Sequence, residues 1–316
     1  MTQESKINLA ANEIDQSMFE PLAQEDKNAE YIAVEVKTFA KDSWDRFRKN
    51  KLALAGFIFI ATLVALVVLV PILSPYTYDG MEMENRNALP SLKHIFGTDR
   101  FGRDIFVRIM YGGRISLAIG FASAGINLII GVVYGSIAGY YGGTLDAVMM
   151  RAVDIIYSVP SMLYVILILM VFGNNVWSML LAISLTSWVS MARQVRAQVM
   201  SLKEQEFALA AMVIGASKSR IMFKHLVINA IGPIIVCLTS MVPGAIFTES
   251  FLSFVGIGLS APSSSWGTLA NETRQIYSTY PIQVIWPVCA ICLTILSLNF
   301  IGDGVGEAFQ PKRKDN

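Results

Sequence analysis

Charge is what this sequence has least of. Only 16% of its 316 residues are Asp, Glu, Lys or Arg, while 54% are hydrophobic. A water-soluble domain of this length needs more charge on its surface, so the composition indicates an integral membrane protein. The formal net charge of +1 offers no excess of basic residues for a nucleic acid, and we predict no nucleic-acid partner.

Histidine and cysteine are also rare. His94 and His225 are the only two histidines, too few for a histidine-rich metal site. All three cysteines lie in apolar runs; Cys289 and Cys292 form a C-x-x-C pair but lack the strand-to-helix context of a redox motif. We interpret the cysteines, Cys237 included, as small apolar residues of membrane helices.

The sequence shows no secretory signal at its start. Residues 1–37 carry eight acidic residues against three lysines and precede the first apolar run, so they form neither the basic nor the apolar part of a signal peptide. We expect a polar, mobile cytoplasmic tail over 1–40, a membrane domain over 41–310, and a basic cytoplasmic tail over 311–316.

Long windows without any charge define the predicted spans. These windows are 52–78, 115–145, 155–192, 226–248 and 275–302. A helix needs about 20 apolar residues to cross the hydrocarbon, and Gly173-Asn174-Asn175 divides the longest window with a turn signal. The sequence therefore predicts an all-α, polytopic membrane protein with six transmembrane helices, at about 52–73, 115–138, 150–172, 176–195, 226–255 and 282–302.

Basic residues flanking these spans predict the orientation. Five of them, Lys41, Arg46, Arg48, Lys49 and Lys51, crowd the entrance to the first span. The loop 193–225 and the C-terminal tail are basic as well, and basic loops stay in the cytoplasm. We expect both termini and 193–225 to lie on the cytoplasmic side of the cell membrane, and 74–112, 173–175 and 256–281 to lie on the outer side. The segment 74–114 opposes this assignment, because it carries six basic residues of its own.

Residues within or beside the spans suggest packing and pathway roles. Gly131, Gly135 and Gly139 recur every four residues, a spacing that lets a second helix approach closely. Ionisable residues at membrane depth are functional candidates, so we weigh pathway and structural roles equally for Glu249. Asp154 is expected to pair with Arg151 on the same helix face.

The segment 201–229 is the most informative polar stretch. Ser201 followed by Glu204 matches a capping box and predicts a helix start. A short helix over 206–214 should end at Gly215, which can adopt positive φ, and Ser217 should cap a second short helix. Such a helix–glycine–helix elbow, with small Ala210 and Ala211 on its surface, is typical of a segment that binds in a partner's groove.

Glu206, Ala210, Ala211 and Gly215 resemble the EAA-loop signature of binding-protein-dependent ABC importer permeases. The similarity extends along the chain beyond residue 40, through RKNKLALAG (48–56), GTDRFGRD (97–104), GYYGG with Asp146 and Arg151 (139–151), VDIIYSVPS (153–161), SLKEQEF (201–207), SWG (265–267) and GDG (302–304). The ordered series resembles the C-type permease subunit of dipeptide, oligopeptide and nickel importers. One departure is Ile228, where the family usually has proline.

The resemblance implies a type I importer permease fold in which the elbow, with Glu206, Ala210, Ala211, Gly215 and Ser217, couples to an ATPase. It also implies four kinds of partner: a second, homologous permease subunit, two ABC ATPases, an extracytoplasmic binding protein and membrane lipids. The chain lacks a P-loop, because Ser217 stands where the glycine before Lys218 would be. We therefore expect no cofactor and no catalysis here, with ATP bound by the partner ATPases. Peptides are the expected substrate; nickel and glutathione are alternatives, and a secondary transporter or channel subunit fits less well.

Overall fold

The computed structural model describes residues 38–259 and 263–309, and its regular structure in these two ranges is helical. The predicted tails over 1–40 and 311–316 lie almost entirely outside the described residues. Residues 42–316 group into one unit, and the arrangement below concerns this unit alone.

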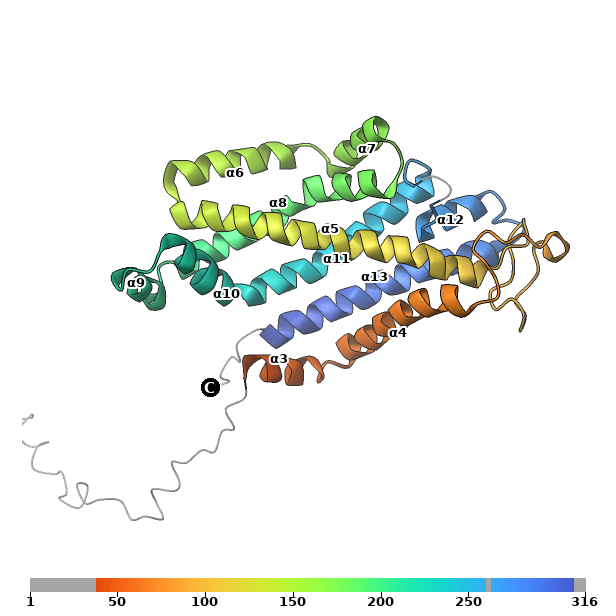
Figure 1. Cartoon of the computed structure of the whole chain (residues 1–316), viewed down its shortest axis with the longest axis horizontal. Coiled ribbons are helices and arrows are strands. Elements are labelled where there is room, and N and C mark those ends of the chain that lie inside the picture. The colour runs from red at the N-terminus through yellow and green to blue at the C-terminus, as the bar shows by residue number, and fades with distance from the viewer. Residues whose placement is uncertain (1–37, 260–262, 310–316) are drawn as a thin grey trace, which may run out of the picture. The chain divides into compact units, whose positions relative to one another are not determined.

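Most of the helices follow one another with short connections, and the longest connecting segment is 74–104. They are α3 (Phe39–Phe47), α4 (Lys51–Leu73), η2 (Met83–Asn85), α5 (Ile105–Tyr141), α6 (Gly143–Ser158), α7 (Ser161–Phe172), α8 (Val176–Leu202), α9 (Glu206–Val213), η3 (Arg220–Leu226), α10 (Val227–Asn229), α11 (Ile231–Val255), α12 (Trp266–Arg274) and α13 (Pro281–Phe309). Figure 1 shows α4, α5, α8, α11 and α13 running alongside one another, with α9 at one end of the bundle and α12 at the other.

Within the described ranges, four helices are long and apolar enough to cross a membrane: α4, α5, α11 and α13. The predicted helix over 150–172 is instead two helices, α6 and α7, bent by 79° with respect to each other. Pro160 lies at the break, and Val159 before it is extended, because a proline ring excludes the helical conformation from the preceding residue. Counting this pair as one span gives five, so the predicted number of six is not confirmed.

The long helices also begin and end elsewhere than predicted. Helix α5 starts at Ile105 instead of 115, capped by Asp104, whose carboxylate accepts the Val107 N–H at 2.9 Å. Two arginines that the sequence placed in a loop, Arg108 and Arg114, are therefore helical. Helix α11 starts five residues later than the predicted 226, and α13 continues to Phe309.

Glycines bring the helices into close contact at two interfaces. A β-carbon at Gly131, Gly135 or Gly139 of α5 would lie only 2.4 to 2.7 Å from the nearest atom of α8, which belongs to Met191, Ala192 or Arg196 respectively. Gly56 of α4 and Gly304 of α13 are similarly close to the opposite helix. These positions admit only hydrogen as a side chain, so backbone lies against backbone at both interfaces.

Candidate functional site

The segment after α8 forms an elbow of two helical pieces. We define the elbow as residues 203–226, comprising α9, the turn at Gly215 and η3. Gly215 has φ +80°, the conformation predicted for it, and the Ser217 hydroxyl accepts the Arg220 N–H at 3.4 Å. The predicted capping box is wrong: Ser201 lies in the last turn of α8, which continues to Leu202 because no residue interrupts its hydrogen bonding.

The second piece of the elbow is a π-helix. Its seven residues, 220–226, run directly into α10 and, through Ala230, into α11. A π-helix is rare at this length, and such segments are frequent at functional positions. The elbow is therefore joined to α11 by helical backbone that is interrupted only at Ala230.

The elbow has its own apolar core on the bundle side. Ala208, Ala211, Ile221 and Leu226 are buried together with residues of α8, among them Val199. The sequence analysis placed both Ala210 and Ala211 on the exposed surface of the elbow. Ala210 is exposed, but Ala211 is buried, with an exposed fraction of only 5%. The helical period separates the two neighbours, because residues one apart face different sides of a helix.

The outward side of the elbow is apolar and bordered by positive charge. Val213 and Ile214 are 86% and 83% exposed, and Leu209 and Met212 are about half exposed. Three exposed basic residues follow them, Lys218, Arg220 and Lys224. An exposed apolar patch with a charged border is typical of a protein-binding surface.

Polar contacts fix the elbow to the bundle. The Lys203 ammonium donates to the Gly139 carbonyl at 3.1 Å, at the end of α5 where helix carbonyls lack partners. The Arg196 guanidinium of α8 donates both of its hydrogen bonds to the Asp146 carboxylate of α6. The first contact links the elbow to α5 directly, and the second links α6 to α8, the helix that leads into the elbow.

A groove of about 1150 Å³ opens on one side of the bundle. Its walls are the α6–α7 break, α8, α11 and the end of α13. The polar lining residues carry hydroxyl, amide or thiol groups and no charge: Tyr157, Ser158, Ser161, Thr186, Ser187, Ser190, Gln194, Cys237, Ser240 and Thr248. Along α11 the groove extends from Gly232 to Thr248, a length of about 24 Å at 1.5 Å per residue.

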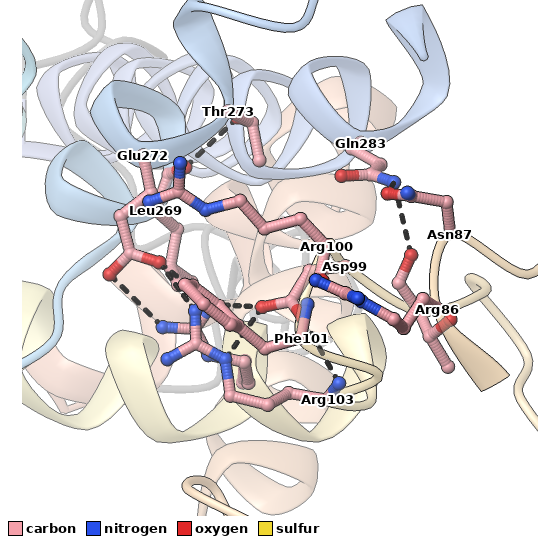
Figure 2. A network of polar contacts seen from close by, with 12 residues as sticks. Arg86, Asn87, Asp99, Arg100, Phe101, Arg103, Leu269, Glu272, Thr273 and Gln283 are labelled. Carbon is pink, nitrogen blue, oxygen red and sulfur yellow. Dashed lines mark hydrogen bonds and ion pairs between the residues drawn. The ribbon is translucent and has the colours of Figure 1, made fainter. Parts of the chain in front are cut away.

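The opposite end of the bundle carries an ordered cap, which we define as residues 74–104 with α12. In Figure 2, Arg103 lies between the carboxylates of Asp99 and Glu272, which it bonds at 2.7 and 2.9 Å. Arg108 of α5 bonds the same two carboxylates at 2.9 and 3.0 Å. Gln283 of α13 donates to Asn87 at 3.0 Å, so the cap connects α5, α12 and α13 (Figure 2).

Sequence comparisons match both parts of the chain to one kind of protein. Residues 131–315 match the model of the binding-protein-dependent transport system inner membrane component, and residues 38–90 match that of the N-terminal TM domain of oligopeptide transport permease C. The chain belongs to this inner membrane component family. It is thus a multi-pass membrane protein of the permease type.

Two relatives from Bacillus subtilis (strain 168) match nearly the whole chain. The oligopeptide transport system permease protein OppC is 45% identical, over 95% of this chain and 98% of that protein. The dipeptide transport system permease protein DppC is 40% identical, over 95% of this chain and 94% of that protein.

A solved structure shares the fold of this inner membrane component. It is a chain of the MetNI methionine ABC transporter in an inward-facing conformation, with a TM-score of 0.51. The sequence identity is 16%, and the match covers 66% of this chain and 97% of the other. The likeness supports the predicted importer permease fold.

Glu249 lies inside this permease bundle and away from the groove. Its side chain has no exposed surface, and it accepts hydrogen bonds from Ser116 and Ser253 at 2.9 Å and from Ser250 at 3.3 Å. It is absent from the groove lining, whose α11 residues end at Thr248. The geometry favours the structural role for Glu249 over the pathway role.

Two further features differ from the sequence interpretation. Asp154 pairs with Arg193 of α8 at 2.8 Å and not with Arg151, because α6 lies along α8. The groove residues were missed altogether. Serine and threonine recur on α8 and α11, but each hydroxyl is ordinary in its own helix, and only the packing of the helices gathers them.

Proposed function

We propose that this chain is the peptide-conducting permease subunit of an ATP-driven importer in the cytoplasmic membrane. The elbow faces the cytoplasm and binds a separate ATPase, and the cap faces outward, where an extracytoplasmic binding protein delivers the substrate. A second, homologous permease subunit covers the groove, and the two permeases rest on two ATPases. Both termini lie in the cytoplasm under this arrangement.

One observation carries the coupling part of the proposal: α11 both follows the elbow and lines the groove. Only α10 and Ala230 separate the elbow from Ile231, and the groove lining begins at Gly232. A movement of the elbow thus reaches the groove wall directly, without passing through a flexible loop. Rigid elements that are moved by a partner are a common means of conformational coupling.

The groove supports a peptide as the cargo. Its lining offers hydroxyl and amide groups, which can exchange hydrogen bonds with peptide amides, and no charged side chain. A lining without fixed charge does not discriminate between acidic and basic side chains, because ion pairing is absent. The names of OppC and DppC, which match nearly the whole chain, agree with this assignment.

The test of the coupling surface is Ile214→Asp. At 83% exposure this side chain contributes little to the fold, so membrane abundance should stay unchanged. A carboxylate buried without a partner at a protein interface costs several kcal/mol. We expect recovery of the ATPase with the permease to fall by at least about tenfold, which corresponds to about 1.4 kcal/mol, and peptide uptake to fall with it.

The matched control is Ile214→Leu, which preserves an apolar side chain at the same position. It should retain ATPase recovery and uptake of a radiolabelled oligopeptide in a strain that lacks the native permease. If Ile214→Asp keeps both, the elbow is not the coupling surface. If uptake of peptides is absent even in the wild type while ATPase recovery is normal, the peptide assignment is wrong.

A further inference from the structure

A buried histidine in the cap has one ring nitrogen without a hydrogen-bond partner. His94 is only 3% exposed, and its Nδ1 lies 2.9 Å from Oδ2 of Asp104, which is itself buried. Its Nε2 has no hydrogen-bond partner among the described residues, and the nearest carboxylate oxygen, Oε2 of Glu82, is 3.9 Å away. Buried polar atoms are normally paired, so this nitrogen requires an explanation.

The hydrogen-bond partner of Nδ1 determines whether Nε2 of the neutral ring carries a hydrogen. An ionised carboxylate only accepts hydrogen bonds, so Nδ1 must carry a hydrogen to bond Asp104. In the neutral ring, Nε2 is then an acceptor that faces a second acceptor, the Glu82 carboxylate. A proton on Nε2 makes it a donor and gives the ring a positive charge between two carboxylates.

The remaining groups around the ring do not compete for Nε2. The Tyr76 ring lies 4.9 Å from the His94 ring, centroid to centroid. Lys93 points to Glu82, with its Nζ 3.7 Å from Oε2. The Asn85 amide donates to Glu82 at 2.7 Å and, with smaller contributions from Lys93 and His94, holds the pKa of the Glu82 carboxyl below its usual range. The Glu82 carboxylate therefore places a negative charge beside the His94 ring.

We propose that His94 is a proton-binding site that tightens the cap in mild acid. The protonated ring bonds both Asp104, the N-cap of α5, and Glu82, at the start of η2. These two residues lie ten positions after and twelve positions before His94 in the chain, so the protonated ring connects distant parts of the cap. The site gives the permease a response to the acidity of the solution at the cap. It depends on the cap alone and not on the identity of the transported substrate.

Hydrogen exchange of the full-length permease in lipid nanodiscs tests the proposal. Exchange rates of amides in 82–104 are compared at pH 8.0 and pH 5.5, after correction for the intrinsic effect of pH on exchange. We expect protection to rise about threefold to tenfold at pH 5.5, the size expected for a charge-assisted hydrogen bond to a partly exposed carboxylate. Protection of the elbow should not change.

Glu82→Gln is the decisive variant, because it keeps the shape and the contact with Asn85 but removes the charge that attracts the proton. At least half of the pH-dependent protection should disappear, and His94→Gln should abolish it. His225→Gln, on the elbow, is the control that should leave it intact. A wild-type cap with no pH dependence, or a Glu82→Gln cap with the full wild-type response, overturns the proposal even if His94→Gln fails to fold.

Discussion

The close contact between α5 and α8 can be tested with a single methyl group. In Gly135→Ala, the added β-carbon would lie 2.4 Å from the Ala192 carbonyl oxygen and 2.9 Å from the Val195 β-carbon. Atoms of the backbone and β-carbons cannot rotate away from the clash. Because carbon contacts are comfortable only at about 3.5 Å, the two helices must separate by about 1 Å at this point.

The cost of that separation follows from its extent. Gly131 and Gly139 lie equally close to α8 one turn to either side, so parting the helices at Gly135 weakens those contacts too. Overpacking of a dense interior costs about 1 to 3 kcal/mol. In a membrane, where close van der Waals contact supplies much of the helix association, we expect a value toward the upper end of that range.

Gly125 provides the control within the same helix. A β-carbon there has no neighbour within 4 Å, and alanine is the better helix former by about 1 kcal/mol. Thermal unfolding of the purified proteins in one detergent should show a lower midpoint for Gly135→Ala and an unchanged or higher midpoint for Gly125→Ala. Equal midpoints for wild type and Gly135→Ala would refute the packing argument.

Three further predictions concern the groove, a proline and the orientation. With the other two cysteines replaced by serine, a bulky maleimide that reaches Cys237 should block uptake, and labelling without a block would remove the groove from the pathway. Arg114→Leu should destabilise the protein by about 2 kcal/mol, since its guanidinium bonds two α4 carbonyls at 3.0 Å near Pro71; in Pro71→Ala the same substitution should cost less in thermal unfolding. Cysteines placed at Ser217 and Leu92, both exposed, should label from opposite sides of the membrane, and labelling from one side would contradict the proposed topology.

The sequence predicted the helical class well because apolar runs without charge are unambiguous. It misplaced the start of α5 because Arg108 and Arg114 looked like loop residues. Beside the nearby Asp99, Arg108 bonds Glu272, which is 164 residues away in the chain, and Arg114 bonds the carbonyls of Val67 and Val68. No local pattern reveals such partners.

The same contacts reduce the conflict in the charge bias of segment 74–114. Basic residues mark the cytoplasmic side because they are costly to carry across the membrane. Arg103 and Arg108 are neutralised inside the cap by Asp99 and Glu272, and Arg114 lies against a proline-interrupted helix. Three of the six basic residues in this segment are thus bonded within the fold, which weakens their argument against a position outside.

In the candidate site too, features set by neighbouring residues could be predicted from the sequence, and features set by packing between helices could not. The turn at Gly215 could be predicted, because one residue type and a short apolar helix determine it. The burial of Ala211 could not, because the elbow packs on α8 and the side facing α8 is not marked in its own sequence. Likewise the break at Pro160 was hidden by the apolar window around it, although proline alone gives the physical reason.

The two ends of α11 are held in different ways, and this difference bears on how a groove could open. At one end the helix follows the elbow, whose outward side is exposed and available to a partner. At the other end Glu249 is fixed by hydroxyls of α5 and α11, and Gly267 of α12 lies so close to Ser250 that a β-carbon would be 2.3 Å from its carbonyl oxygen. A helix that is pushed at one end and fixed at the other pivots. The groove lining near Gly232 should therefore move more than the lining near Thr248, so that the groove opens first toward the elbow.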